Sequence, residues 1–196
     1  MNMEIKRPES AQPIPDHAKK VFDGVVFDVY QWEQELFDGS KAVFEKIKRL
    51  DTVMIIPVMS DGKIILLNQQ QPGTNPILCL PGGRIEKSEE VLSSAKRELL
   101  EETGCESDDF VLWDAIQPVG KIEWAIYTFI AKNCKKVAGL NLDSGEKIEL
   151  KYVSFDEFID IVLHNKDFRD YEVKWKLLDM KDDVDKMAEL RKLFLG

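Results

Sequence analysis

Short apolar runs follow one another along this chain, and their spacing predicts the order of its secondary structure. Runs of aliphatic and aromatic residues bounded by Gly, Asp or Ser are typical of strands. Such runs occupy residues 21–36, 41–48, 52–59, 63–71, 110–116, 123–132 and 146–153. The first two predict two or three strands. Ser60, Asp61 and Gly62 join the third and fourth, which we interpret as a hairpin in the core sheet.

Between the fourth and fifth runs, the apolar period changes to that of a helix. Val91, Leu92, Ala95 and Leu99 form one stripe, so the pattern predicts a helix near residues 89–103 that buries this stripe against a sheet.

The flanking residues predict the ends of this helix. Ser88 is a favourable N-cap, and Glu89 and Glu90 would lie in the first turn, where the helix dipole favours acids. Gly104 is placed to end the helix in the left-handed conformation.

Two further helices are predicted near the C-terminus. Ser154 and Glu157 have the spacing of a capping box, which opens a helix that runs to about His164. A final amphipathic helix covers about residues 182–194. Strands interleaved with two or three helices predict an α/β fold with a mixed sheet sandwiched between helices.

An acidic cluster lies on the predicted helix of residues 89–103. Acids on a helix often lie on a solvated face, which is the ordinary interpretation. Glu98, Glu101 and Glu102, however, are three and four residues apart, so they share one face and repel one another. A hard divalent cation such as Mg²⁺ prefers carboxylate oxygens and would relieve this repulsion.

The loop before the helix supports the same hypothesis. Pro81, Gly82 and Gly83 form a segment whose backbone can approach a metal or a phosphate closely, because glycine has no side chain in the way.

Together, the loop and the helix resemble a known motif. The pattern is Gly83, five residues, Glu89, seven residues, then Arg97, Glu98, Leu99, Leu100, Glu101, Glu102, Thr103, Gly104 and Cys105. This order resembles the Nudix box, and only Cys105 departs from it, because the family usually has an aliphatic residue there. The resemblance implies a Nudix-type α/β/α sandwich over residues 51–196, and Mg²⁺-dependent cleavage of phosphorus anhydrides, with Mn²⁺ as an alternative cofactor.

The resemblance also assigns roles to residues. Glu98, Glu101 and Glu102 would be the metal ligands, assisted by the backbone carbonyl of Gly82. Arg97 would orient Glu89 or Glu98 through a bidentate ion pair.

A general base in related enzymes often comes from a loop outside the box. Glu146 is our candidate, with Asp143 and Glu149 behind it. Glu102, or hydroxide formed at the metal, is the alternative that needs no separate base.

The strands of residues 21–50, which precede the Nudix-like part, are similar to those of the ADP-ribose pyrophosphatase branch, where they mediate dimerisation. We therefore expect a homodimer. Gln71 and Cys79 stand where that branch has an arginine and a glutamate. The substrate predicted by the branch is a nucleoside diphosphate linked to another group, such as ADP-ribose or a nucleotide sugar.

Composition limits the remaining interpretations. A chain of 196 residues with 44% hydrophobic content can bury one sizeable core, and a net charge of −9 argues against nucleic-acid polymers and anionic membranes as partners. Residues 1–20 are polar and carry several prolines, which predicts a flexible arm rather than a signal peptide. Three cysteines without metal-site spacing indicate reduced thiols and a cytoplasmic protein.

Two alternatives to this activity stay open. One is a Nudix enzyme that hydrolyses nucleoside triphosphates. The other is a catalytically silent Nudix-type ligand sensor, which the intact acidic set disfavours.

Overall fold

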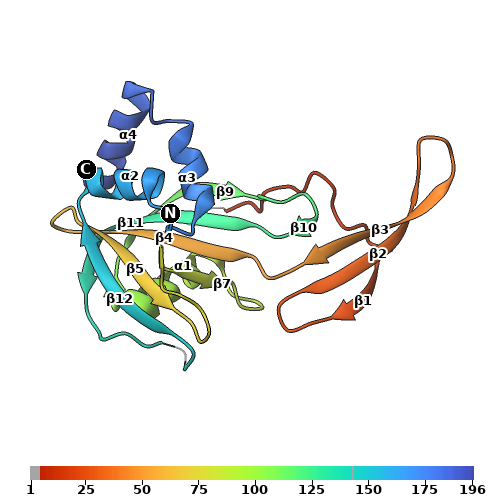
Figure 1. Ribbon diagram of the computed structural model, residues 1–196, viewed down its shortest axis with the longest axis horizontal. Coiled ribbons are helices and arrows are strands. Elements are labelled where there is room, and N and C mark those ends of the chain that lie inside the picture. Colours follow the sequence, from red (N-terminus) through yellow and green to blue (C-terminus); the bar gives the residue numbers. More distant parts are fainter. Residues whose placement is uncertain (1–4, 143) are drawn as a thin grey trace.

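The computed structural model of the protein describes residues 5–142 and 144–196, and a mixed sheet lies at its centre (Figure 1). The main strands of this sheet run in the order β12 (Lys147–Val153), β5 (Ile64–Gln70), β4 (Thr52–Met59), β11 (Ile126–Lys136) and β8 (Cys105–Glu106). Strands β4 and β11 are parallel and the other neighbours are antiparallel, so the predicted mixed sheet is confirmed. Strand β9 (Asp109–Ile116) also pairs with β11.

The predicted hairpin β4–β5 opens soon after its turn, and this opening creates room for a site. The two strands pair directly at Val58 and Ile64. Beyond that point, β5 pairs with β6 (Ile77–Cys79) and β4 pairs with β7 (Gly82–Arg84). The chain therefore passes from β6, beside β5, to β7, beside β4, through the turn at Pro81 and Gly82.

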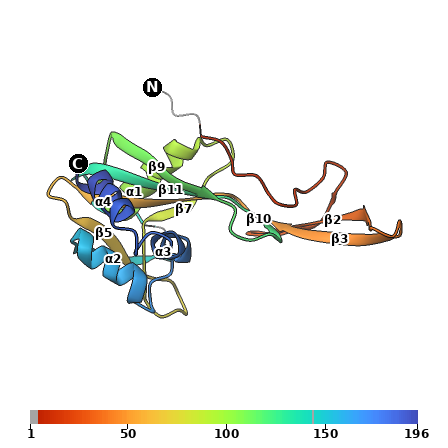
Figure 2. The same ribbon diagram turned by 90° about the horizontal axis from the view of Figure 1, so that it is seen from above.

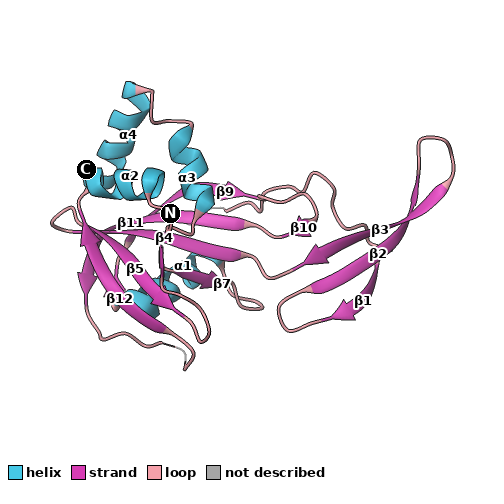
Figure 3. Ribbon diagram, in the orientation of Figure 1, coloured by secondary structure: helices cyan, strands magenta, loops and turns pink. Residues whose placement is uncertain are grey.

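Helices cover both faces of the sheet (Figure 3). Helix α1 (Val91–Thr103) packs on one face with Ala95 and Leu99, as its apolar stripe predicts. Helices α2 (Phe155–His164), α3 (Tyr171–Leu178) and α4 (Val184–Leu195) cover the other face. The predicted α/β/α sandwich is confirmed.

Three details of the helices differ from the predictions. Ser88 is not the N-cap of α1: it has φ 69°, and the helix begins after Glu90, which makes no side-chain cap bond. Glu89 is not in the first turn, because its carboxylate accepts a bond from the backbone N–H of Glu86 and binds Arg97 instead. Helix α3 was not predicted, since its eight residues are too few to show a clear period.

The remaining helix ends agree closely with the sequence. Gly104 ends α1 with φ 64°, and Ser154 and Glu157 form the predicted capping box of α2. Helix α4 is capped by Asp183, so it begins slightly later than predicted. No helix in the described residues has the length and apolarity needed to cross a membrane.

A second sheet projects from one end of the domain (Figure 2). It contains β1 (Lys19–Asp23), β2 (Asp28–Glu35) and β3 (Lys41–Lys48), which are antiparallel neighbours, and β10 (Ile122–Glu123), which runs parallel to β3. The sequence predicted two or three strands here, and the structure has three before β4.

The segment before β1 runs along the place where the projecting sheet meets the central sheet. Residues 1–4 lie outside the described residues, and residues 5–18 contain no helix or strand. Arg7 forms ion pairs of 2.8 Å with both Asp51 and Glu123, while Lys46 binds Glu123 and the backbone oxygen of Gln12. These bonds fasten residues 7–12, part of the expected arm, to the point where the two sheets meet.

Candidate active site

The acidic face of α1 is largely withdrawn from solvent. Glu98 is 9% exposed and Glu102 is 5% exposed, whereas Glu101, one turn from Glu98, is half-buried. Because Leu99, the neighbour of Glu98 along the helix, is fully buried in the core, the helix cannot turn these carboxylates outward. A merely solvated face is therefore excluded for Glu98 and Glu102.

Arg97 holds the carboxylates of the motif together. Its Nε and Nη2 bind the two oxygens of Glu89 at 2.9 and 3.0 Å, and its Nη1 binds Glu98 at 2.8 Å and Glu101 at 3.0 Å. Nη2 also donates to the carbonyl of Arg84. The guanidinium holds the pKa of Glu89 at about 2, and these anions in turn raise the pKa of Arg97. The structure thus pairs Arg97 with both of its predicted partners.

The backbone of the glycine loop positions Glu102 through a hydrogen bond. The backbone N–H of Gly82 donates to its Oε2 at 2.7 Å. Gly82 has φ 156°, and a Cβ there would overlap the carbonyl oxygen of Val53, while a Cβ on Gly83 would overlap the Glu98 carboxylate. Backbone atoms leave room only for glycine at position 82, whereas a side chain at position 83 would displace the Glu98 carboxylate, so the loop and the acids form one unit.

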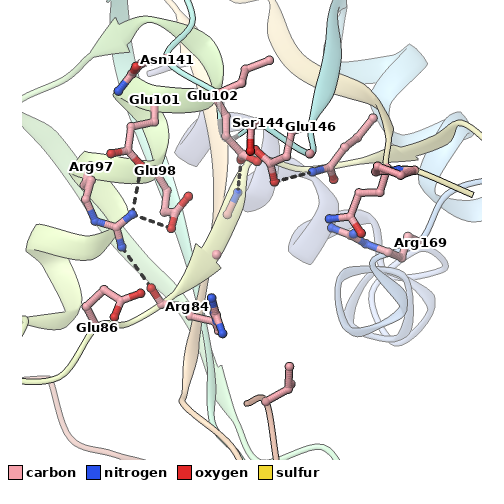
Figure 4. Close-up of a pocket in the computed structure, with 18 of the residues that line it drawn as sticks. Arg84, Glu86, Arg97, Glu98, Glu101, Glu102, Asn141, Ser144, Glu146 and Arg169 are labelled. Atoms are coloured by element: carbon pink, nitrogen blue, oxygen red, sulfur yellow. Dashed lines mark hydrogen bonds and ion pairs between the residues drawn. The ribbon is translucent and has the colours of Figure 1, made fainter. Parts of the chain in front are cut away.

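These groups form one wall of a large cavity of about 1130 Å³ (Figure 4). The other walls come from segments far away in the sequence. They are Val25 and Val26 of the β1–β2 loop, Arg49 after β3, Gln69, Gln71 and Pro72 around the end of β5, the loop before β12, and Arg169.

Comparison with known proteins identifies this arrangement. The model of the NUDIX domain matches residues 48–176, which is well over half of the chain. The chain belongs to the NUDIX domain family. The predicted Nudix hydrolase is thereby confirmed.

Two curated relatives and a solved structure agree with this assignment. A methanol dehydrogenase activator from Bacillus methanolicus is 29% identical over 160 residues, which is 80% of this chain and 84% of the relative. An ADP-ribose pyrophosphatase from Bacillus subtilis (strain 168) is 29% identical over 147 residues, 74% of this chain and 80% of the relative. The crystal structure of an ADP compounds hydrolase shares the fold, with a TM-score of 0.70 at 20% identity, over 95% of this chain and 98% of that one.

The pKa values of the Nudix acids indicate that the described part of the site lacks enough positive charge to balance them. Burial raises the pKa of Glu98, and it raises the pKa of Glu102 to about 8, so negative charge at these sites is poorly compensated. In the described residues, no three His, Cys, Asp or Glu side chains already converge as a metal site. A set of carboxylate oxygens with excess negative charge nevertheless fits a hard divalent cation.

The predicted general base lies in the same cavity. Glu146 immediately precedes β12 and lines the cavity, where it accepts a hydrogen bond of 3.3 Å from Nε2 of Gln69. Gln69 in turn accepts a bond from the thiol of Cys79. Of the two other candidate bases, Glu149 is exposed and does not line the cavity, and Asp143 lies outside the described residues.

Sequence reasoning missed the basic residues of the cavity. Arg49 stacks on Trp124, with its Cζ 4.5 Å from the ring centroid, and its Nε is buried without a hydrogen-bond partner in the described structure. Burial and the nearby charge of Arg84 lower the pKa of Arg49. Arg169 enters from the segment between α2 and α3. Neither Arg49 nor Arg169 belongs to a motif, so no local signal marks them.

Proposed function

We propose that this Nudix hydrolase is Mg²⁺-dependent and cleaves the diphosphate linkage of a nucleoside diphosphate joined to another group, as in ADP-ribose or a nucleotide sugar. The observation that carries the proposal is that one cavity combines three motif carboxylates with arginines from outside the motif. The names of the relatives, an ADP-ribose pyrophosphatase and an ADP compounds hydrolase, support this substrate class.

In this proposal Glu98, Glu101 and Glu102, with the carbonyl of Gly82, hold Mg²⁺, and Mn²⁺ is the alternative. A bound divalent ion neutralises the charge of the diphosphate and lowers the pKa of water. Arg97 keeps Glu98 and Glu101 oriented, with Glu89 as its anchor on the far side.

Glu146 accepts a proton from the attacking water in this mechanism. The water oxygen bonds to one phosphorus as the bridging P–O bond breaks, and the products are a nucleoside monophosphate and the phosphate ester of the other group. Gln69 donates a hydrogen bond to Glu146 and thereby helps to position its carboxylate.

A panel assay tests the substrate class. ADP-ribose, nucleotide sugars, dinucleotides and nucleoside triphosphates are incubated with the chain and Mg²⁺, and the products are separated. We expect monophosphate release from the linked diphosphates and none after chelation. Hydrolysis of triphosphates alone would contradict the substrate class, and binding without hydrolysis would indicate a sensor.

Metal dependence has a second readout that does not require turnover. Because the acids on α1 repel one another without a cation, millimolar Mg²⁺ or Mn²⁺ should raise the melting temperature. Calorimetry that shows no shift, together with hydrolysis that resists chelator, would refute the metal site.

We also propose that the projecting sheet joins two copies of the chain in a homodimer. All five residues of β1 are exposed, and Val21, Phe22 and Val25 are 52%, 59% and 96% exposed. Apolar side chains on a projecting strand are typical of an interface. Since Val25 also lines the cavity, a partner at this place would help to enclose the substrate.

The cytoplasm is the compartment that we propose. Cys79, Cys105 and Cys134 are all buried free thiols, which suits a reducing environment.

A further inference from the structure

Arg169 is one of the charged residues of the cavity whose role remains unassigned. It lies between α2 and α3, more than sixty residues beyond the Nudix box. Figure 4 shows its guanidinium directed into the cavity, with Arg97 and Arg169 on opposite sides of Glu102 and Glu146. The acids of the site therefore lie between two arginines.

The backbone that carries Arg169 is fixed to the strand before the glycine loop. The N–H of Arg169 donates to the carbonyl of Leu78 at 2.9 Å, and the N–H of Leu78 donates to the carbonyl of Asp167 at 3.0 Å. The carboxylate of the buried Asp170 accepts a bond of 2.6 Å from the N–H of Leu80. These three bonds hold Arg169 in a set position relative to Gly82, two residues beyond Leu80.

The two arginines differ in how far their donors are already used. Both Nη groups and Nε of Arg97 already donate hydrogen bonds. Their acceptors are the carboxylates of Glu89, Glu98 and Glu101 and the carbonyl of Arg84. Arg169, in the described part of the structure, makes one side-chain bond, a long contact of 3.4 Å from Nε to Asp170. Its two Nη groups have no protein acceptor among the described residues, and its side chain, which lines the cavity, is 48% exposed.

The charge of Arg169 already acts on the acidic wall. It lowers the pKa of Glu102, although burial outweighs it there. A cation with free donors, placed beside acids that would hold Mg²⁺, faces the position where the anionic oxygens of a bound diphosphate would lie. The planar guanidinium fork suits two phosphate oxygens at once.

We propose that Arg169 binds the diphosphate of the substrate, on the side of the cavity opposite Arg97, and contributes to selectivity for diphosphate compounds. This assignment rests on the proposed function and extends it to a residue outside the Nudix box. Arg97 orients the acids and Arg169 contacts the substrate, so the two arginines have separate tasks.

The test compares Arg169→Gln and Arg169→Lys with Lys166→Gln, a matched control. Lys166 is an exposed cation in the same connecting segment and does not line the cavity. Calorimetric titration with ADP in the presence of Mg²⁺ measures binding, and steady-state kinetics on ADP-ribose measure turnover. Melting curves establish that each variant is folded.

We expect Arg169→Gln to weaken ADP binding at least tenfold and to lower kcat/KM on ADP-ribose by a similar factor, because a charge-assisted bond to phosphate is lost. Arg169→Lys keeps the charge without the fork and should fall between Arg169→Gln and the wild type. Lys166→Gln should match the wild type.

The assignment is overturned if folded Arg169→Gln and Arg169→Lys bind ADP as the control does, or if the wild-type chain does not bind ADP. Those results leave the proposed function intact as long as the wild type hydrolyses a linked diphosphate and Glu102→Gln does not. Failure of the proposed function has a different signature, since the wild type would then hydrolyse no linked diphosphate in the panel.

Discussion

The central sheet and the projecting sheet are built from similar strands but are supported in opposite ways. In β4 six of eight residues are buried, whereas all five residues of β1 are exposed. Strand β4 lies between two helical layers, and β1 lies at the edge of a sheet that no helix covers (Figure 2). Backbone pairing alone thus does not distinguish a core strand from an exposed strand.

The junctions of the two regions differ as well. The central sheet is held by apolar clusters on both faces, while the projecting sheet is tied to the domain by a polar group of Lys46, Glu123 and Arg7. Lys46 is 1% exposed and bonds to Ser10, Gln12 and Glu123, so its charge is paired although it is buried. The central sheet is therefore stabilised mainly by apolar burial, whereas the projecting sheet keeps exposed apolar side chains such as Val21, Phe22 and Val43.

The largest expected effect is on the chemistry of the domain. Glu102→Gln keeps the size of the side chain and removes a charge, so activity should fall at least about a hundredfold while the metal-free chain is no less stable than the wild type. Glu90→Gln on the exposed start of α1 is the control and should retain activity. Equal rates in the two variants would mean that the acids do not hold the metal.

The same residue predicts a pH dependence of stability without metal. The pKa of Glu102 is raised from 4.5 to about 8 in the folded chain, so folding favours its protonated form. The free energy of unfolding should therefore fall as pH rises from about 4.5 to about 8, by an amount on the order of a few kcal/mol. Glu102→Gln lacks this loss. Denaturant melts at several pH values should show the Gln variant gaining on the wild type toward pH 8, and parallel profiles would refute the shift.

A matched pair of valines compares the two sheets directly. Val53 in β4 is 1% exposed and Val43 in β3 is 70% exposed. Val53→Ala should cost about 2 kcal/mol of unfolding free energy, because it removes buried methyl groups and leaves a cavity. Val43→Ala should change it by less than about 0.5 kcal/mol. Urea melts on both variants check this difference, which similar costs would contradict.

The smallest of these effects concerns assembly. Phe22→Asp places a charge on the exposed face of β1 and should raise the dissociation constant of the dimer about tenfold or more, since a charge at an apolar interface loses its hydration. Light scattering over a dilution series measures this. Val184→Asp, which adds the same charge to an apolar residue 82% exposed on α4, should leave the dimer unchanged. A wild-type chain that is monomeric at micromolar concentration would refute the dimer itself.

Local patterns predicted much of this molecule, and they failed where distant segments intervened. The end of α1 at Gly104 and the capping box of Ser154 and Glu157 involve residues at most a few positions apart, and both were found as predicted. The start of α1 was wrong at Ser88, because Arg97 draws Glu89 into an ion pair eight residues away. Helix α3 is too short to show a clear apolar period in the sequence. Tertiary packing, which buries Val173 and Leu177, decides that this segment is a helix.

For the site, the sequence alone determined which groups share a helix face. The shared face of Glu98, Glu101 and Glu102 follows from helix geometry, and the close backbone approach that Gly82 and Gly83 allow follows from their lack of a side chain. Only the tertiary structure decided that Glu102 has a pKa of about 8, and that Arg49, Glu146 and Arg169 line the same cavity. The physical reason is range: helical spacing is local, whereas desolvation and Coulomb interactions depend on which distant segments the opened β4–β5 hairpin brings together.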